Sequence, residues 1–138
     1  MTDKDFCDYE TSDMLRRLGY RTTSIAFYPS QNYIVDGIDD NGELYEIECE
    51  KGKLMYYSST VNKTKIKDKI EAPLLYEAQK WLREVQNIIV LVQYLMAENG
   101  DWQYIVNSKR SRVLYHSYEE ALANGVKDAV SRLKTINP

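Results

Sequence analysis

The segment APLLYEAQKWLREVQNIIVLVQY, residues 72–94, determines the fold, because a helix in it leads directly into a strand. Its apolar residues recur at steps of three and four as far as Val85, which is typical of an amphipathic helix. Pro73 suits the first turn, where a helix needs no backbone N–H. After Asn87 the pattern changes to the β-branched run Ile88–Val92, which predicts a buried strand. The segment supplies apolar residues for a hydrophobic core and contains no motif that indicates a particular reaction.

Length and composition indicate one soluble domain. The chain has 138 residues, of which 43% are apolar and 28% are charged, and this is enough for a hydrophobic core. The net charge of −3 gives no overall attraction to nucleic acid or to an anionic membrane. The longest apolar run, Ile88–Ala97, is interrupted by Gln93 and is too short to cross a bilayer. The polar start Met1–Asp5 does not resemble a secretory signal. Cys7 and Cys49 form neither a disulfide framework nor a CxxC motif, so a cytoplasmic protein is expected.

The first half of the chain predicts a short helix followed by a β-hairpin. Residues 9–18 have helical spacing, with a cap near Thr11 or Ser12. Strand signals follow at Thr23–Tyr28 and Gln31–Ile38, as two strands or as one interrupted strand. After a turn signal at 39–42, Glu43–Glu50 alternates between a face expected in the core and a solvated carboxylate face.

The second half predicts a helix, three antiparallel strands and a second helix. A turn at Asn99-Gly100 separates the first strand from a return strand over Trp102–Asn107, and a third strand is expected over Arg112–Tyr115. Ser117–Glu120 fits a capping box, and helical spacing then continues to about Leu133. We therefore predict an α+β fold: a short N-terminal helix and β-hairpin followed by helix, three-stranded antiparallel sheet and helix, with both later helices on one face of the sheet.

A Lys-rich connection, Lys51–Ile70, lies between residues 1–50 and residues 71–138 of this predicted single domain. It contains six lysines and one aspartate, a local charge of +5, so the rest of the chain carries −8. Its last eight residues alternate with period two, as an edge strand guarded by lysines would, and a loop remains open as the alternative. The candidate binding residues, for a nucleic acid or an acidic partner, are Lys63, Lys65, Lys67 and Lys69.

The acidic strand suggests a nuclease-like alternative. The element order matches the core of PD-(D/E)XK nucleases, and Asp36, Glu48 and Glu50 resemble their D…E-x-E arrangement, with Lys51 adjacent. Such sites hold Mg²⁺ through carboxylate oxygens and place a lysine near the scissile phosphate. The usual (D/E)-x-K tripeptide needs an acid where Cys49 stands. The alternation favours the other interpretation, in which these carboxylates form the solvated face of a hairpin.

Other chemical motifs are missing from the sequence. His116 is the only histidine, and no second His or Cys pair completes a metal set. No P-loop, GxSxG or GxGxxG motif occurs, so no cofactor is expected and the balance is against an enzyme. Trp81 and Trp102 fall on core-facing positions and are interpreted as packing residues.

The sequence contains Ala72-Pro73, the run A-x-KWLREV-x-NI at 78–88 and SYEEAL at 117–122. In these motifs residues 72–130 resemble a group of small uncharacterised proteins from genomes and prophages of Bacteroides-type gut bacteria. The resemblance implies phage or mobile-element ancestry and a compact cytoplasmic fold, and it carries no catalytic residue. The ending SYEEALANGVKDAV also looks like the helix of HicB-type antitoxin domains. The matching positions of the larger group are Ala72, Pro73, Ala78, Lys80, Trp81, Leu82, Arg83, Glu84, Val85, Ile88, Trp102, Ser117, Tyr118, Glu119, Glu120, Ala121 and Leu122.

Two functions from different classes follow. The first is a small non-enzymatic interaction protein of phage or mobile-element origin that works through protein contacts, with a homodimer left open. The second is a nucleic-acid-binding protein that uses the Lys-rich segment, with or without the Mg²⁺ site at Asp36, Glu48 and Glu50. No membrane partner is expected.

Overall fold

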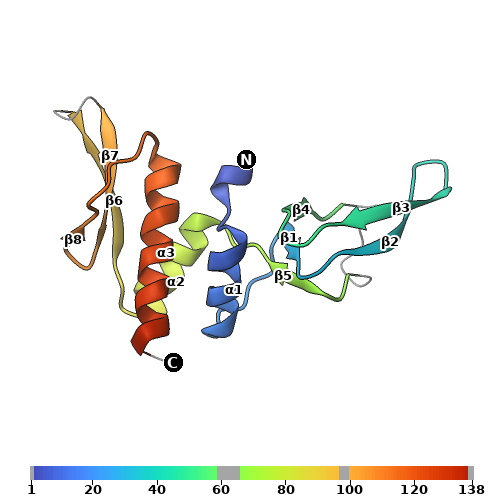
Figure 1. Ribbon diagram of the computed structural model, residues 1–138, viewed down its shortest axis with the longest axis horizontal. Helices are drawn as coiled ribbons and strands as arrows, with labels where there is room; N and C mark the ends of the chain where they lie inside the picture. The colour runs from blue at the N-terminus through green and yellow to red at the C-terminus, as the bar shows by residue number, and fades with distance from the viewer. Residues whose placement is uncertain (1, 59–65, 97–99, 137–138) are drawn as a thin grey trace.

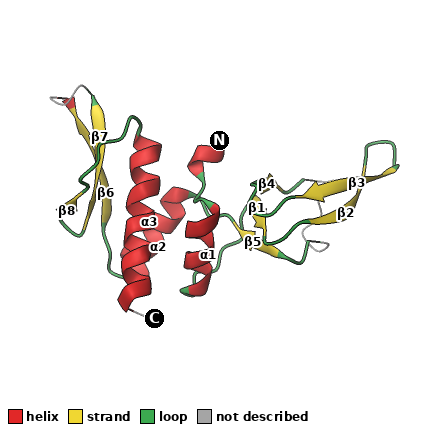
Figure 2. Cartoon of the chain, viewed as in Figure 1, coloured by secondary structure: helices red, strands yellow, loops and turns green. Residues whose placement is uncertain are grey.

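The structure, a computed structural model, describes residues 2–58, 66–96 and 100–136, and the side chains of 134–136 are outside that description. Within these residues, three α-helices and three small antiparallel sheets confirm the predicted α+β fold (Figures 1 and 2). In chain order the elements are η1 (Asp3–Asp5), α1 (Tyr9–Arg17), β1 (Ala26–Pro29), β2 (Tyr33–Ile38), β3 (Leu44–Cys49), β4 (Met55–Tyr56), β5 (Lys69–Glu71), α2 (Leu75–Val85), β6 (Val90–Leu95), β7 (Asp101–Val106), β8 (Lys109–Arg110) and α3 (Tyr118–Ile136).

Figure 1 shows an elongated molecule with a β-sheet at each end of its long axis. The β6–β7–β8 sheet lies at one end, and α3 and α2 lie on its inner side. Helix α1 follows, then the small β4–β1–β5 sheet, and the β2–β3 hairpin forms the opposite end. The molecule therefore presents two sheet structures that are far from each other.

The second half of the fold has the predicted order of elements, but the strand predicted as buried over Ile88–Val92 is β6 (Val90–Leu95), in which only Val90 is fully buried because the other face of the strand is exposed. Helix α2 ends at Val85, Asn87 adopts a positive φ of 56°, and β6 begins at Val90. This strand pairs antiparallel with β7 over its whole length, from Val90↔Val106 to Leu95↔Asp101. Both helices contact the same sheet, and α3 contacts β6 and β7 alike. Alternate side chains of the two strands therefore enter the core beneath the helices.

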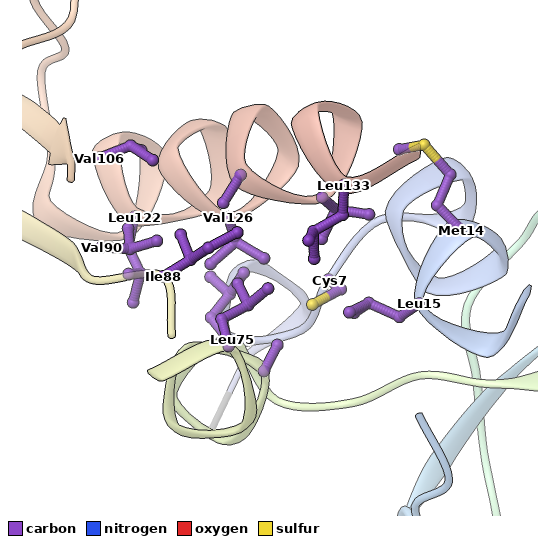
Figure 3. Close-up of a cluster of buried hydrophobic side chains, with 14 residues drawn as sticks. Cys7, Met14, Leu15, Leu75, Ile88, Val90, Val106, Leu122, Val126 and Leu133 are labelled. Carbon is purple, nitrogen blue, oxygen red and sulfur yellow. The ribbon is translucent and has the colours of Figure 1, made fainter. Parts of the chain in front are cut away.

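One continuous core joins α1 to the α2–sheet–α3 unit. Leu15 from α1, Leu82 from α2 and Val126 from α3 are fully buried in the same cluster. Figure 3 shows side chains from α1, α2, β6 and α3 meeting in this cluster, with the Cys7 thiol among them. Trp81 is half-buried against the cluster and contacts the ring of Tyr20 at 5.2 Å between centroids. The predicted packing role of Trp81 is therefore confirmed.

The N-terminal cap of α1 differs from the prediction near Thr11 or Ser12. Asp8 is the cap, and its Oδ1 accepts a hydrogen bond from the Thr11 N–H at 2.7 Å. Thr11 and Ser12 instead lie inside the helix and are buried. Asp8 satisfies a free N–H of the first turn equally well, so the helix begins earlier than the Thr-Ser signal indicates.

The third strand of the C-terminal sheet also lies earlier than predicted. Asn107 and Ser108 both have positive φ, 46° and 73°, so the chain reverses in a tight two-residue turn directly after β7. The strand β8 is therefore Lys109–Arg110, and not Arg112–Tyr115. Only Tyr115 of the predicted range pairs with β7, through an isolated bridge to Trp102.

The central β4–β1–β5 sheet is not apparent in the sequence pattern. Its strands have two to four residues and come from distant parts of the chain: Phe27 in β1 pairs with Met55 on one side and with Glu71 on the other. The Lys-rich connection thus supplies an edge strand at β5, which begins only at Lys69. Residues 59–65 lie outside the described residues.

Candidate functional site

More than half of the strand residues of the β2–β3 hairpin are exposed. Its strands pair in register from Tyr33↔Cys49 to Ile38↔Leu44, and Asp39 closes the turn by accepting N–H groups of Asn41 and Glu43. Figure 1 shows the hairpin extending away from the rest of the molecule. Only its base therefore receives support from other elements.

One face of the hairpin contacts the body of the protein near the base. Tyr33, Val35 and Ile47 pack against the cluster around Phe27 and Cys49. The Tyr33 hydroxyl donates to the Asp68 carbonyl at 3.1 Å, and burial raises the pKa of Tyr33 to about 12. Farther out, Gly37 lies opposite Tyr45, whose ring covers the position that a Cβ would occupy. Tyr45 itself is exposed, so the predicted core face is buried only at the base and the middle of the hairpin.

The opposite face of the hairpin exposes large apolar side chains. Leu44 is 71% exposed, Ile34 is 58% exposed and Ile38 is 48% exposed. Ile38 and Leu44 lie directly opposite each other in the ladder, so they form a pair near the tip. On this face the Asp36–Glu46 pair separates Ile34 from the Ile38–Leu44 pair. An exposed apolar pair bordered by polar groups is typical of a surface that another molecule covers.

Carboxylates surround this apolar face. Residues 33–50 contain seven Asp and Glu residues and no Lys or Arg, so the hairpin carries −7. The rest of the chain has 18 basic and 14 acidic residues and carries +4. The mild net charge of the chain therefore conceals an acidic arm on a basic body.

The structure places the predicted nuclease residues on this exposed face. Asp36 pairs with Glu46 and lies diagonal to Glu48, while Glu50 follows the end of β3. All of these carboxylates are exposed. The Lys51 N–H donates to the Asn32 side chain at the hairpin base. Within the described residues, no group of three or more His, Cys, Asp or Glu side chains is arranged to hold a metal ion.

Glu48 and Glu50, without Asp36, line a shallow depression at the hairpin base. Its volume is about 520 Å³, and the other lining residues include Tyr33, Ile34 and Cys49. The depression thus continues the mixed apolar and acidic character of the hairpin face.

The predicted lysine residues are only partly described. Lys63 and Lys65 lie outside the described residues, Lys67 is exposed, and Lys69 begins β5. The Lys69 ammonium lies 3.6 Å from a Glu71 carboxylate oxygen and 4.8 Å from the centroid of the Tyr57 ring. Lys69 therefore already has an anionic neighbour within its own sheet.

Lys69, Arg16 and Arg21 together line a cavity. No pattern in the sequence had indicated that the two arginines belong to a site. The cavity has a volume of about 280 Å³ and lies between α1, the following loop and β5, with Arg16 and Arg21 in its lining. Ser12, Tyr20 and Thr22 contribute hydroxyl groups and Glu71 contributes a carboxylate. Its cations have internal partners: Arg16 bonds to Asp13 at 2.7 Å, and Arg21 donates to the Arg16 carbonyl at 2.8 Å.

His116, the two cysteines and Glu71 are also chemically reactive groups, and their surroundings are as follows. His116 is exposed and lies 3.4 Å from a carboxylate oxygen of Asp101. Cys7 and Cys49 are both free and buried, and burial raises the pKa of each thiol. Glu71 accepts a hydrogen bond from the Tyr57 hydroxyl, and its other oxygen is buried without a partner among the described residues.

The exposed apolar face of the hairpin is the feature that sequence reasoning missed. A signal was present, because Tyr33–Ile38 has apolar residues on both faces: Tyr33 and Val35 on one, Ile34 and Ile38 on the other. Both faces of a hairpin at the end of the molecule cannot be buried by its own chain. The arginines of the cavity gave no such signal, since α1 and β5 are far apart in the sequence.

Comparison of the chain with family models, with curated proteins and with solved structures finds no match. In the described part of the chain, none of the helices has both the length and the apolar character that a membrane span requires.

Proposed function

We propose that the protein is a non-enzymatic interaction protein whose β2–β3 hairpin docks on a basic protein surface. The observation that carries the proposal is the exposed apolar face of Ile34, Ile38 and Leu44, set within a hairpin of charge −7. The support for an origin of the protein in a phage or mobile element is the resemblance over residues 72–130. The homodimer left open by the sequence would use a different surface, the β6 edge.

Charge and apolar content together specify the kind of partner. Apolar side chains supply the binding free energy once they are desolvated, and Leu44 and Ile38 are placed to act as such anchors. Carboxylates around them steer encounter toward positive surfaces and repel acidic ones, nucleic acid included. The matching partner is therefore a protein with an apolar groove bordered by Lys and Arg.

The position of the hairpin favours docking. A two-stranded hairpin without further support is marginally stable in water, and this one is supported by the core only near its base. A partner that covers the outer face of the hairpin would remove apolar surface from water and stabilise the tip. Binding and ordering of the tip would then be coupled.

Site-specific crosslinking tests this proposal. Leu44 is replaced by p-benzoylphenylalanine, and the full chain is irradiated in a lysate of the cells that express it. The control carries the same group at Tyr76, which is 62% exposed on α2. We expect a product specific to position 44 whose partner, identified by mass spectrometry and purified, has a basic surface. Equal products at both positions, or a partner with an acidic surface, would contradict the proposal.

Purified partner then allows a quantitative test. Leu44→Asp should weaken binding by about tenfold or more, because it puts a charge at an apolar anchor, whereas Tyr76→Asp should have no effect. Glu46→Lys with Glu48→Lys should slow association and reduce its salt dependence. A dissociation constant that is unchanged by Leu44→Asp, with unfolding curves that match wild type, would rule out the hairpin as the docking site.

A second candidate is nucleic-acid binding, and one observation favours it: Arg16, Arg21 and Lys69 line a common cavity beside the Lys-rich connection. Released from their internal partners, these cations could engage phosphate groups. Labelled DNA and RNA titrated at low salt test this idea. Arg16→Glu with Arg21→Glu, and separately the Glu variants of Lys63, Lys65, Lys67 and Lys69, should abolish any binding through this region. Binding that neither set changes would exclude the basic region.

The catalytic version of this candidate stays a hypothesis. It would require Asp36, Glu48 and Glu50 to hold Mg²⁺ through their carboxylates. A Mg²⁺-dependent nuclease assay with Glu48→Ala as the control tests it directly. Activity that persists in Glu48→Ala would assign the cleavage to another source.

A further inference from the structure

We propose that two copies of the chain associate through the open edge of β6 and join their three-stranded sheets. The inference concerns the end of the molecule opposite the β2–β3 hairpin (Figure 1) and does not depend on the hairpin's function.

The hydrogen-bond pattern shows which backbone groups of β6 are open. Strand order is β6–β7–β8, so β6 has one unpaired edge. The Asn107 N–H donates to the Ile89 carbonyl at 3.0 Å, which places the bonded pairs of the β6–β7 ladder at odd-numbered β6 residues. Because such pairs alternate along an antiparallel ladder, the N–H and C=O groups of Val90, Val92 and Tyr94 point to the open edge.

The protein itself fills one of these positions. The Gln79 side chain on α2 donates from Nε2 to the Val90 carbonyl at 2.7 Å. Among the described residues, the edge-facing backbone groups of Val92 and Tyr94 have no hydrogen-bond partner. The open part of the edge is therefore short and has a defined centre at Gln93.

This open segment is complementary to itself. If two copies of β6 align antiparallel with a two-fold axis at Gln93, Val92 of one copy lies opposite Tyr94 of the other, and the reverse holds as well. Each of these pairs can exchange both of its N–H···O bonds, so the same register satisfies both copies. A symmetric contact of this kind is the usual way in which identical chains form a closed dimer.

The strand also lacks the features that prevent edge association. Natural edge strands are commonly short or carry Lys, Pro or a bulge, whereas β6 is six residues long, VLVQYL, with neither charge nor proline. Two copies would therefore meet without like-charge repulsion. In the same register, Met96, which is 81% exposed, lies opposite Val90 of the other copy. It is then next to α2 of that copy, whose Gln79 side chain bonds to the Val90 carbonyl. The dimer would thus bury an otherwise exposed apolar side chain.

Disulfide trapping tests both the contact and its register. In the proposed pairing Gln93 faces itself as a non-bonded pair, with Cα atoms about 4.5 Å apart, which is compatible with a disulfide. Full-length Gln93→Cys should form a covalent dimer under oxidised glutathione, the oxidant that accepts the two thiol electrons. Leu91→Cys should not, because position 91 faces position 95. The native thiols of Cys7 and Cys49 are buried and do not compete.

A charge-exchange pair distinguishes a lost contact from a damaged fold. Gln93→Lys places two ammonium groups at the axis and Gln93→Glu places two carboxylates there. Each variant alone should raise the dimer dissociation constant by about tenfold or more relative to wild type in sedimentation equilibrium. An equimolar mixture should recover the dimer as a Lys–Glu heterodimer. A wild type that stays monomeric at millimolar concentration, equal crosslinking of both cysteine variants, or failure of the mixture to associate would overturn the proposal.

Discussion

Asp8 shows at the residue scale how one carboxylate connects two helices. Its Oδ1 caps α1 at the Thr11 N–H, and its Oδ2 lies 3.5 Å from the Lys127 ammonium on α3. Burial raises the pKa of Asp8, but the Thr11 hydrogen bonds and Lys127 outweigh burial and the net shift is downward. The ionised form is therefore the one that the folded protein favours.

Replacement of Asp8 separates its cap from its charge. Asp8→Ala should lower the free energy of unfolding at pH 7 by about 1 kcal/mol, because a first-turn N–H loses its acceptor, whereas Asp8→Asn keeps the cap and should cost less. The folded pKa lies below the unfolded value of 3.8, so the contribution of the charge is present above that pH and is lost as the pH falls. Urea unfolding at pH 7 and pH 3 measures both effects. Equal stability of Asp8→Ala and wild type at pH 7 would disprove the capping role.

Tyr104 gives a prediction at alkaline pH. Burial, followed by the hydrogen bond that its hydroxyl donates to Asp128 at 2.8 Å, raises its pKa from 10.0 to about 12. Since the raised pKa favours the neutral phenol in the folded state, stability should be complete below pH 10 and fall as the pH rises toward 12. Tyr33 and Tyr56, also raised to about 12, add to this loss. Tyr104→Phe should give a shallower fall in urea unfolding between pH 10 and 12, and Tyr76→Phe, on the surface of α2, should keep the wild-type slope.

At the scale of elements, the approach of α3 to the sheet depends on Gly125. A Cβ at this position would lie 2.9 Å from Val90 Cγ1 and 3.0 Å from Tyr104 Cβ, so the side chains of Val90 and Tyr104 would have to shift. Alanine normally stabilises a helix interior by about 1 kcal/mol relative to glycine, while overpacking costs about 1–3 kcal/mol. We therefore expect Gly125→Ala to be destabilising in thermal unfolding, against its helix propensity. Asn124→Ala, at the adjacent and less buried position, should be neutral or stabilising. A higher melting temperature for Gly125→Ala would show that α3 is not held this close.

The sequence predicted the elements that a local pattern of residues defines, and it did not predict those that depend on contacts between distant parts of the chain. The α2–β6 unit was predictable because its periodicity and the change after Asn87 are local. The β4–β1–β5 sheet was not, since its two- to four-residue strands are too short for periodicity and pair across distant parts of the chain. The carboxylate face of β3 was predicted. The apolar residues on both faces of Tyr33–Ile38 indicated that one apolar face would stay uncovered, but which face it is depends on how the rest of the molecule packs against the hairpin.

At the scale of the whole molecule, stability is concentrated away from the hairpin. The large cluster contains residues of α1, α2, β6, β7 and α3, whereas the outer half of β2–β3 belongs to no buried cluster. Unfolding of the helical core should therefore involve α1 and the C-terminal sheet together, and the hairpin tip should open independently at lower free energy.

Hydrogen exchange of two variants tests this division. Leu15→Ala truncates a fully buried side chain of α1 and should cost about 2–5 kcal/mol. Because Leu15 shares a core with Val90 and Val126, we expect faster exchange in β6, β7 and α3 as well as in α1. Replacement of residues 37–45 by Asn-Gly joins Asp36 to Glu46 by a two-residue turn and keeps the contacts at the hairpin base. This second variant should leave exchange in the helical core unchanged. If Leu15→Ala accelerated exchange in α1 alone, the first helix would be an independent unit and the common core would be refuted.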